Sequence, residues 1–138
     1  MSFPSTKDFY ERYRDDREGA RRAAYELGGQ MAQELLLKVG SGGNDLEKVA
    51  AVLNEFQKIV QGEPNARVED GRITMSCRGL CPIMRAAMTL DIPWEWLYRN
   101  LALPMFHGMA SSIVADMKVR LVSAKYRGDP ACIYVFET

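Results

Sequence analysis

Four side chains in this sequence have the chemistry of nucleophiles, bases or soft metal ligands: Cys77, Cys81, Cys132 and the single histidine, His107. Cys81 directly precedes Pro82, an order typical of a helix N-cap followed by proline at the first helical position. At such a position the unpaired N–H groups and the helix dipole favour a thiolate. Imidazole is the side-chain base best suited to neutral pH, so Cys81 and His107 are the candidate catalytic pair.

The same four residues are the candidate ligands of a metal site. Three cysteines and one histidine would suffice for tetrahedral zinc. Cys77 and Cys81 flank the end of a predicted strand and the start of a predicted helix, and the site closes only if His107 and Cys132 reach the same point. Free cysteine is also among the most buried residue types and packs as a small hydrophobic group. Core packing is the main expectation for these thiols, so no cofactor is predicted, and zinc is the alternative.

Methionine and aromatic side chains are abundant between residues 75 and 136. Eight methionines in the chain provide adaptable, polarizable surface of the kind that lines ligand pockets. The same residues could instead form a solid core, and both interpretations stay open. Arg78, Arg85 and Arg99 could hold a carboxylate at a pocket mouth, or lie on the surface. The candidate ligand-binding residues are Met75, Met84, Met88, Trp94, Trp96, Met105, Phe106, Met109, Tyr134 and Phe136.

Composition excludes several classes of function. The chain has 138 residues with 18 basic and 18 acidic side chains, so its formal net charge is zero. A chain of this length suits one domain with a substantial core. It lacks the basic footprint of a nucleic-acid-binding protein. No segment has the pattern of a secretion signal or a membrane span, so we expect a cytoplasmic protein with reduced thiols and no membrane partner.

Two helices are predicted in the N-terminal part. Ser5 and Asp8 form a capping-box-like start, and apolar residues follow at helical spacing. Gly28 and Gly29 interrupt this pattern and indicate either a bend or a close helix crossing. The glycine-rich segment 40–43 ends the first long helical pattern and precedes the second.

The second helix is predicted to begin at Asn44 or Asp45 and to end at residues 62–65. Beyond it, Asp70-Gly71 lies between two short strands. This pair is a strong signal for a two-residue β-hairpin turn, because both positions tolerate positive φ.

Short helices are predicted between residues 82 and 114. Their expected starts are Pro82, the segment 91–93 and Pro104, since proline at the first helical position lacks only an N–H that would be unpaired anyway.

The C-terminal segment 117–138 indicates two strands joined by a turn at residues 127–130. Both faces of the last strand are fairly apolar, so both are expected to be covered. The predicted fold is α+β: two N-terminal helices, a β-hairpin, short helices and a C-terminal β-hairpin, with helices packed on an antiparallel sheet.

The segment 104–137, PMFHGMASSIVADMKVRLVSAKYRGDPACIYVFE, combines a helix with small residues, a strand, a Gly-Asp-Pro-x-Cys turn and an aromatic-rich last strand. This pattern resembles the 4-vinyl reductase or hydrocarbon-binding domain family. It is also similar to L-2-amino-thiazoline-4-carboxylic acid hydrolase-like proteins. The resemblance implies a sheet with helices enclosing an apolar pocket, a small apolar or aromatic molecule as partner, and a homodimer.

The resemblance does not extend to the zinc site of some sensors in the first family. Those sensors use an upstream cysteine, a Glu and a Cys on the penultimate strand, and a Cys on the last strand. Cys132 matches the last ligand, but the two preceding positions hold Leu121 and Ala124, and residues 98–100 contain no cysteine. That zinc site is therefore not expected here.

Three hypotheses for function follow. The first is a small-molecule binding or sensing domain with an apolar or aromatic pocket between the sheet and the central helices. The second is a small cysteine-dependent hydrolase that uses Cys81 and His107 on a small heterocycle. The third is a purely structural dimer subunit with a solid core.

Overall fold

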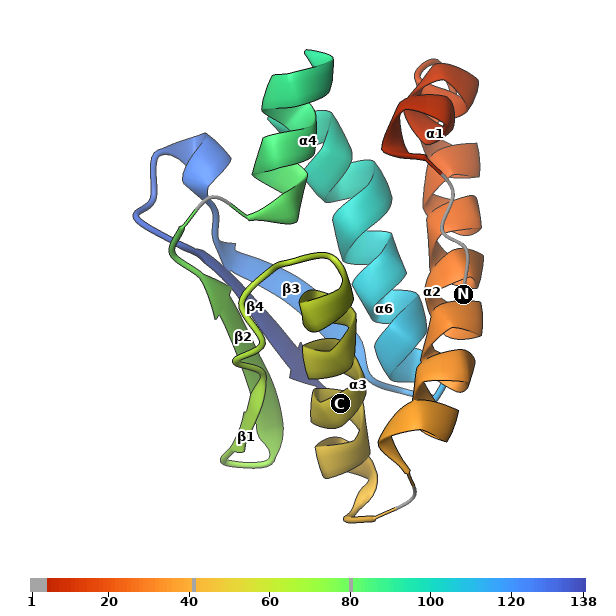
Figure 1. Cartoon of the computed structure of the whole chain (residues 1–138), viewed down its shortest axis with the longest axis vertical. Coiled ribbons are helices and arrows are strands. Elements are labelled where there is room, and N and C mark those ends of the chain that lie inside the picture. Colours follow the sequence, from red (N-terminus) through yellow and green to blue (C-terminus); the bar gives the residue numbers. More distant parts are fainter. Residues whose placement is uncertain (1–4, 41, 80) are drawn as a thin grey trace.

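Helices pack on one face of a four-stranded antiparallel sheet (Figure 1). The structure is a computed structural model that describes residues 5–40, 42–79 and 81–138. Its element order confirms the predicted α+β fold, with a hairpin in the middle of the chain and a second one at the C-terminus. The strands are β1 (Arg67–Glu69), β2 (Arg72–Cys77), β3 (Lys118–Ser123) and β4 (Cys132–Glu137).

The sheet joins two hairpins that are far apart in the sequence. The strand order is β1-β2-β4-β3, so the central contact is the antiparallel pair β2 and β4. Asp70 and Gly71 form the tight turn of the first hairpin with φ values of 53° and 74°, as their types predict. The register of the central pair places Cys77 opposite Cys132. Two of the three cysteines therefore meet at one end of the sheet.

The first helical segment is divided in two, α1 (Thr6–Tyr13) and α2 (Arg17–Val39). Ser5 caps α1 as predicted, since its hydroxyl accepts the Asp8 N–H at 3.4 Å. Asp16 begins the second helix, because its carboxylate accepts the Gly19 N–H at 2.9 Å.

Helix α2 crosses α6 (Leu103–Ser111) at backbone contact. A β-carbon at Gly28 would collide with the carbonyl oxygen of Met105, and one at Gly108 would collide with that of Tyr25. Helix α2 continues without interruption through Gly28, so this glycine marks the close crossing rather than a bend.

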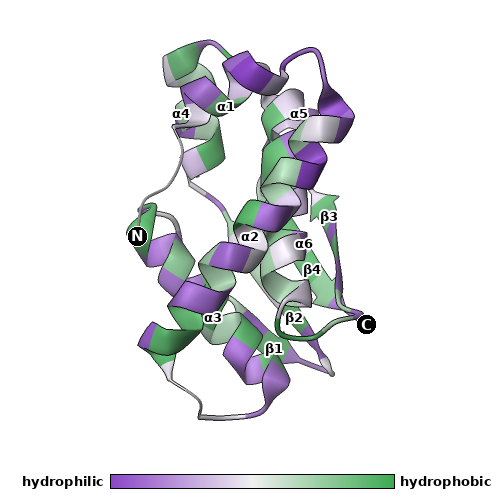
Figure 2. Ribbon diagram, turned by 90° about the vertical axis from the view of Figure 1, so that its right-hand side faces the viewer, coloured by the Kyte–Doolittle hydropathy of each residue, from purple (hydrophilic) through white to green (hydrophobic). Residues whose placement is uncertain are grey.

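Helix α6 occupies the centre of the helical layer. It packs against α2 on one side and β3 on the other, and α3 (Asp45–Ile59) lies beside it. Figure 2 shows α2 as the outer helix, with hydrophilic residues along it, and α6 between α2 and the sheet. Within the described ranges, no helix has the combination of length and apolar character needed to cross a membrane.

The segment from Trp94 to Ser111 is one continuous helical run: α5 (Trp94–Leu97), the π-helical turn η1 (Tyr98–Ala102) and α6. Helix α6 begins beside Pro104, as expected, but it is not separated from the preceding helix. The Leu103 N–H bonds to the Tyr98 carbonyl in the wider π pattern immediately before the proline. The widened turn makes room for the proline ring, which would otherwise press on the carbonyl four residues earlier.

Helix α4 (Pro82–Leu90) begins as predicted, with Cys81 at its N-cap and Pro82 at its first position. It stands at the end of the sheet where Cys77 and Cys132 lie (Figure 1). Asp91 ends the helix with a left-handed φ of 55°.

The expectation that both faces of the last strand are covered holds for much of β4, since Val135 on the second face is buried and Ile133 is half-buried. The neighbouring edge strand β3 is not covered in this way. All helices lie on one side of the sheet (Figure 1), and alternate residues of β3 on the other face are exposed. Val122 is among the exposed apolar side chains of that face. The connection to β4 is longer than a four-residue turn, because the short 3-10 helix η2 (Lys125–Arg127) precedes Gly128. This loop folds back over the thiol end of the sheet.

Candidate functional site

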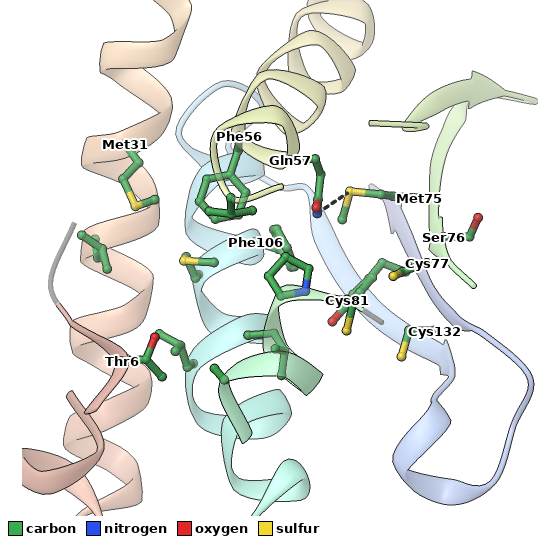
Figure 3. A pocket seen from close by; sticks show the side chains of 18 of the residues that line it. Thr6, Met31, Phe56, Gln57, Met75, Ser76, Cys77, Cys81, Phe106 and Cys132 are labelled. Carbon is green, nitrogen blue, oxygen red and sulfur yellow. Dashed lines mark hydrogen bonds between the residues drawn. The ribbon is translucent and has the colours of Figure 1, made fainter. Parts of the chain in front are cut away.

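An apolar pocket lies between the sheet and the helices (Figure 3). Its volume is about 180 Å³. Helix α2 contributes Leu27 and Met31, α3 contributes Phe56, and α6 contributes Met105 and Phe106. A dry apolar cavity of about 150 Å³ is large enough to bind benzene. The pocket therefore has room for a molecule of about one ring.

Four of the ten candidate ligand-binding residues line this pocket: Met75, Met105, Phe106 and Tyr134. Met75 and Tyr134 are neighbours across β2 and β4, so they form the floor on the sheet side. The ring of Phe106 stands edge-on to that of Tyr134, with centroids 5.0 Å apart. These contacts join the central helix to the sheet at the inner end of the pocket.

The other candidates lie elsewhere. Trp96 is buried against the rings of Phe9 and Tyr10, and Trp94 is half-buried. Met84, Met109 and Phe136 belong to the packed core. Met88 does not face the pocket, because it lies on the solvent side of α4 and is 61% exposed.

The pocket walls from α2 and α3 were not among the sequence candidates for ligand binding. Leu27, Met31 and Phe56 stand on apolar stripes that the helical periodicity does reveal. Periodicity marks a stripe as buried, but it does not say whether the stripe meets another side chain or a cavity.

Three thiols gather at one end of the pocket. Figure 3 shows Cys77 at the end of β2, Cys132 at the start of β4 and Cys81 at the N-cap of α4 together on the sheet side. The hydroxyl of Tyr98 lies 3.0 Å from Cys81 Sγ and 3.0 Å from Cys132 Sγ. We call these four residues the thiol cluster. Sequence reasoning missed Tyr98, because the register of a π-helical turn has no local sequence signal.

The groups of the thiol cluster differ in their tendency to ionise. Hydrogen bonds from Cys132 and Cys77, with a further one from Tyr98, lower the pKa of the Cys81 thiol, although burial acts in the opposite direction. The hydrogen bond to Cys81 and burial raise the pKa of Cys77 and of Cys132. Burial raises the pKa of Tyr98 far above its ordinary value. The cluster therefore favours one thiolate, on Cys81, surrounded by protonated donors.

The loop before β4 closes over the thiol cluster. The Lys125 N–H donates to Cys132 Sγ at 3.4 Å, and the Lys125 ammonium donates to the Gly79 carbonyl at 2.9 Å. The Tyr126 ring packs on that of Tyr98 with centroids 5.2 Å apart. These contacts place Cys132 and Tyr98 behind the loop, so the pocket side is the open approach to Cys81.

His107 is not brought to the thiols. It lines a separate, shallow depression with Arg21, Arg22 and Arg99, and its ring stands edge-on to Tyr25 with centroids 5.0 Å apart. Its neighbour on α6, Phe106, faces the pocket, and consecutive helical residues point roughly 100° apart. The expected Cys81–His107 pair and the four-ligand zinc set are therefore not assembled.

The three thiols do not by themselves form a metal site. In the part of the chain that the structure describes, no group of three or more His, Cys, Asp or Glu side chains is arranged to hold a metal ion. Of the positions that the family resemblance assigns to zinc ligands, Cys132 lies in the thiol cluster, whereas Leu121 is paired with Tyr134 in the sheet.

The described lining of the pocket contains no Lys, Arg, Asp, Glu or His. Arg85 instead donates to the backbone carbonyls of Val60 and Gln61, and Arg99 lies 3.3 Å from Glu95. A ligand carboxylate would thus meet no cationic side chain in this lining. A neutral ligand is the better match.

A second polar group stands at the α3 side of the pocket. The Gln57 amide donates to Met75 Sδ at 3.5 Å, as the dashed line in Figure 3 shows. A thioether sulfur is a weak acceptor. A ligand oxygen could replace it at little cost, so Gln57 can orient a polar group of the ligand.

No protein-family model and no curated protein matches this chain. The resemblance to the 4-vinyl reductase family therefore stays a prediction.

Proposed function

We propose that this protein binds a small, neutral, apolar or aromatic molecule between its sheet and its central helices. The observation that carries the proposal is the pocket of about 180 Å³ with apolar walls. Polar groups in the described lining are few: Thr6, Gln57 and Ser76, together with the thiols on the sheet side. This distribution is typical of small-molecule sites, where apolar surface supplies affinity and a few polar groups supply orientation.

The walls of the pocket can adapt to ligand shape. Met31, Met75 and Met105 line it from α2, β2 and α6. Methionine has an unbranched, flexible side chain with a polarizable sulfur, so it accommodates several shapes at low cost. We infer recognition by size and polarity rather than by a dense hydrogen-bond pattern.

The expected affinity for a simple ring is modest. Burying about 150 Å² of apolar ligand surface contributes about 4 kcal/mol, which corresponds to a Kd of about 1 mM. Tighter binding would need contacts with Gln57 or with the thiol cluster. Simple probes must therefore be tested at millimolar concentration.

The test is titration of the full chain with indole and with toluene, followed by backbone amide NMR. We expect shifts concentrated in α2, α3, α6 and β2. Ala86→Trp should fill the pocket and abolish the shifts, because Ala86 lines it. Met88→Trp on the same helix is the matched control, since Met88 is exposed and outside the pocket. Equal binding by the Ala86→Trp variant, or no binding by the unmodified protein at millimolar probe, would refute the proposal.

The alternative, a cysteine-dependent hydrolase with His107 as base, has less support. Such an enzyme needs a base beside Cys81, and His107 lines a different depression. A solid-core structural subunit also has less support, because the pocket interrupts the core.

We retain a homodimer and a cytoplasmic location as parts of the proposal. A reducing compartment suits the cysteines Cys77, Cys81 and Cys132, which are all free. The homodimer rests on the family resemblance and is checked by sedimentation of the full chain.

A further inference from the structure

We propose that Cys81 bonds covalently to the molecule that enters the pocket, and that this molecule is an apolar α,β-unsaturated ketone or aldehyde. The inference rests on the proposed function, because the apolar cavity must first admit the molecule. It adds the chemical class of the ligand and the atom that captures it.

The position of Cys81 directs reagents through the pocket. Cys81 is only 7% exposed, yet it forms part of the pocket wall. The sulfur stands at the N-cap of α4 and within 3.0 Å of the Tyr98 hydroxyl. Tyr98 is fully buried and belongs to the continuous run that leads into α6, so its hydroxyl is held by the core. The Cys81 sulfur is thus held in a fixed position at one end of the apolar pocket.

The chemistry of the lining selects the class of electrophile. Hydrolysis through an acyl-cysteine needs a base to activate water, and the described lining has no His, Asp or Glu. Addition to an activated carbon–carbon double bond needs only a thiolate and a proton donor. The Met and Phe side chains of the walls favour a neutral, apolar reagent over a charged one.

The proposed step is balanced within the thiol cluster. The Cys81 sulfur attacks the β-carbon of the unsaturated carbonyl compound, so a C–S bond forms and the C=C π bond breaks. The electron pair moves to the carbonyl oxygen as an enolate. A proton from the Cys132 thiol, which also lines the pocket, then reaches the α-carbon. Cys132 regains a proton from water, and the net change is addition of S–H across the double bond, with no oxidant or reductant.

The neighbouring cysteines are poorer nucleophiles. Cys132 is almost completely buried and its sulfur accepts the Lys125 N–H. Cys77 is half-buried, and its sulfur lies 3.7 Å from the Gly79 carbonyl oxygen. Hydrogen bonding to Cys81 and burial raise the pKa of both thiols. Cys81 is therefore the expected site of attack.

The test uses the reduced full chain and cyclohex-2-enone, followed by intact mass and peptide mapping. We expect one adduct per chain, on Cys81. Cys81→Ser should abolish it, and Cys77→Ser, the matched control, should retain it. Tyr98→Phe should slow the addition at least tenfold, because it removes a hydrogen bond to a charged sulfur. First labelling at Cys77, or equal labelling in the Cys81→Ser variant, would overturn the inference.

A saturated analogue separates this inference from the proposed function. Cyclohexanone has the same ring but cannot add a thiol. It should shift the amide signals of the pocket and slow Cys81 labelling of the unmodified protein, a readout that needs no variant to fold. If cyclohexanone binds while cyclohexenone leaves Cys81 unmodified, the covalent step is wrong and the binding function stands. If cyclohexanone, indole and toluene all leave the amide signals of the pocket unchanged, both proposals fail.

Discussion

The hydroxyl of Tyr98 lies 3.0 Å from the sulfur of Cys81, although the two residues belong to separate helical segments. Burial raises the pKa of Tyr98, so this hydroxyl acts as a donor. The pair ties the N-terminus of α4 to the π-helical turn η1. Because the Tyr98 hydroxyl stays protonated, it can donate to the Cys81 thiolate without placing a second negative charge beside it.

Tyr98→Phe should therefore raise the pKa of Cys81, because the phenylalanine ring keeps the packing but cannot donate. The measurement is a pH titration of thiolate absorbance, with Cys81→Ser subtracted. Tyr126→Phe is the control: the Tyr126 ring packs on Tyr98, but its hydroxyl bonds to Arg99 rather than to the thiols. An unchanged titration in the Tyr98→Phe variant would show that its hydroxyl does not stabilise the thiolate.

The thiol cluster should make stability depend on pH. Because folding lowers the pKa of Cys81, the unfolded chain binds more protons at this residue below the ordinary thiol value of about 8.5. The contribution of Cys81 to the free energy of unfolding should thus rise with pH until about pH 8.5 and be lost progressively as the pH falls below that value. Folding raises the pKa of Cys77 and Cys132, so their contribution should decline above about pH 8.5.

Urea unfolding of the unmodified protein and of Cys81→Ser across that range isolates the contribution of Cys81, since groups outside the cluster largely cancel in the difference. The difference in unfolding free energy should widen as the pH rises toward about 8.5. A difference that is constant with pH would mean that Cys81 has the same pKa in the folded and unfolded states.

The parts of the fold that the sequence predicted correctly are those that depend on residues close together in the chain. Ser5 and Asp8 start a helix, Asp70-Gly71 makes a tight turn, and Cys81-Pro82 begins α4. Each feature is fixed by the backbone preferences or capping ability of residues within one turn.

The site depends on contacts that are distant in sequence, and these were predicted only in part. The sequence identified Cys81 and four residues of the pocket, but it also placed His107 beside Cys81. The direction of His107 follows from the helical register of α6, which the π-helical turn η1 shifts. The same turn aims Tyr98 at the thiols, and no short-range pattern signals it.

The crossing of α2 and α6 offers a test of the packing. Gly28→Ala would place a methyl group against the Met105 carbonyl oxygen, so the helices would have to separate. We expect a loss of about 3 kcal/mol in the free energy of unfolding, at the upper end for overpacking. The measurement is urea denaturation.

Gly29→Ala is the matched control for that substitution. Its β-carbon would lie 3.8 Å from the Gly108 carbonyl oxygen, an ordinary contact. Because alanine favours helix over glycine, this variant should gain up to about 1 kcal/mol. Similar losses in the two variants would show that the crossing is not set by Gly28.

Asn100 ties its side chain to the backbone of the helical run around the π-helical turn. Its side-chain N–H donates to the Trp96 carbonyl at 3.0 Å, and its side-chain oxygen accepts from Arg21 Nε at 3.0 Å. The residue is fully buried. Asn100→Ala should therefore cost about 2 to 3 kcal/mol in unfolding free energy, because a buried carbonyl would lose its donor.

Asn100→Asp distinguishes the two hydrogen bonds. A carboxylate keeps an acceptor for Arg21 but presents an oxygen to the Trp96 carbonyl, so the variant should be destabilised about as much as Asn100→Ala. Arg21→Ala, which leaves the bond to Trp96 intact, should cost only about 1 kcal/mol. Both comparisons use urea denaturation at one pH. If Asn100→Asp were as stable as the unmodified chain, the Trp96 carbonyl would not need this donor, and the π-helical turn would have to be held by packing alone.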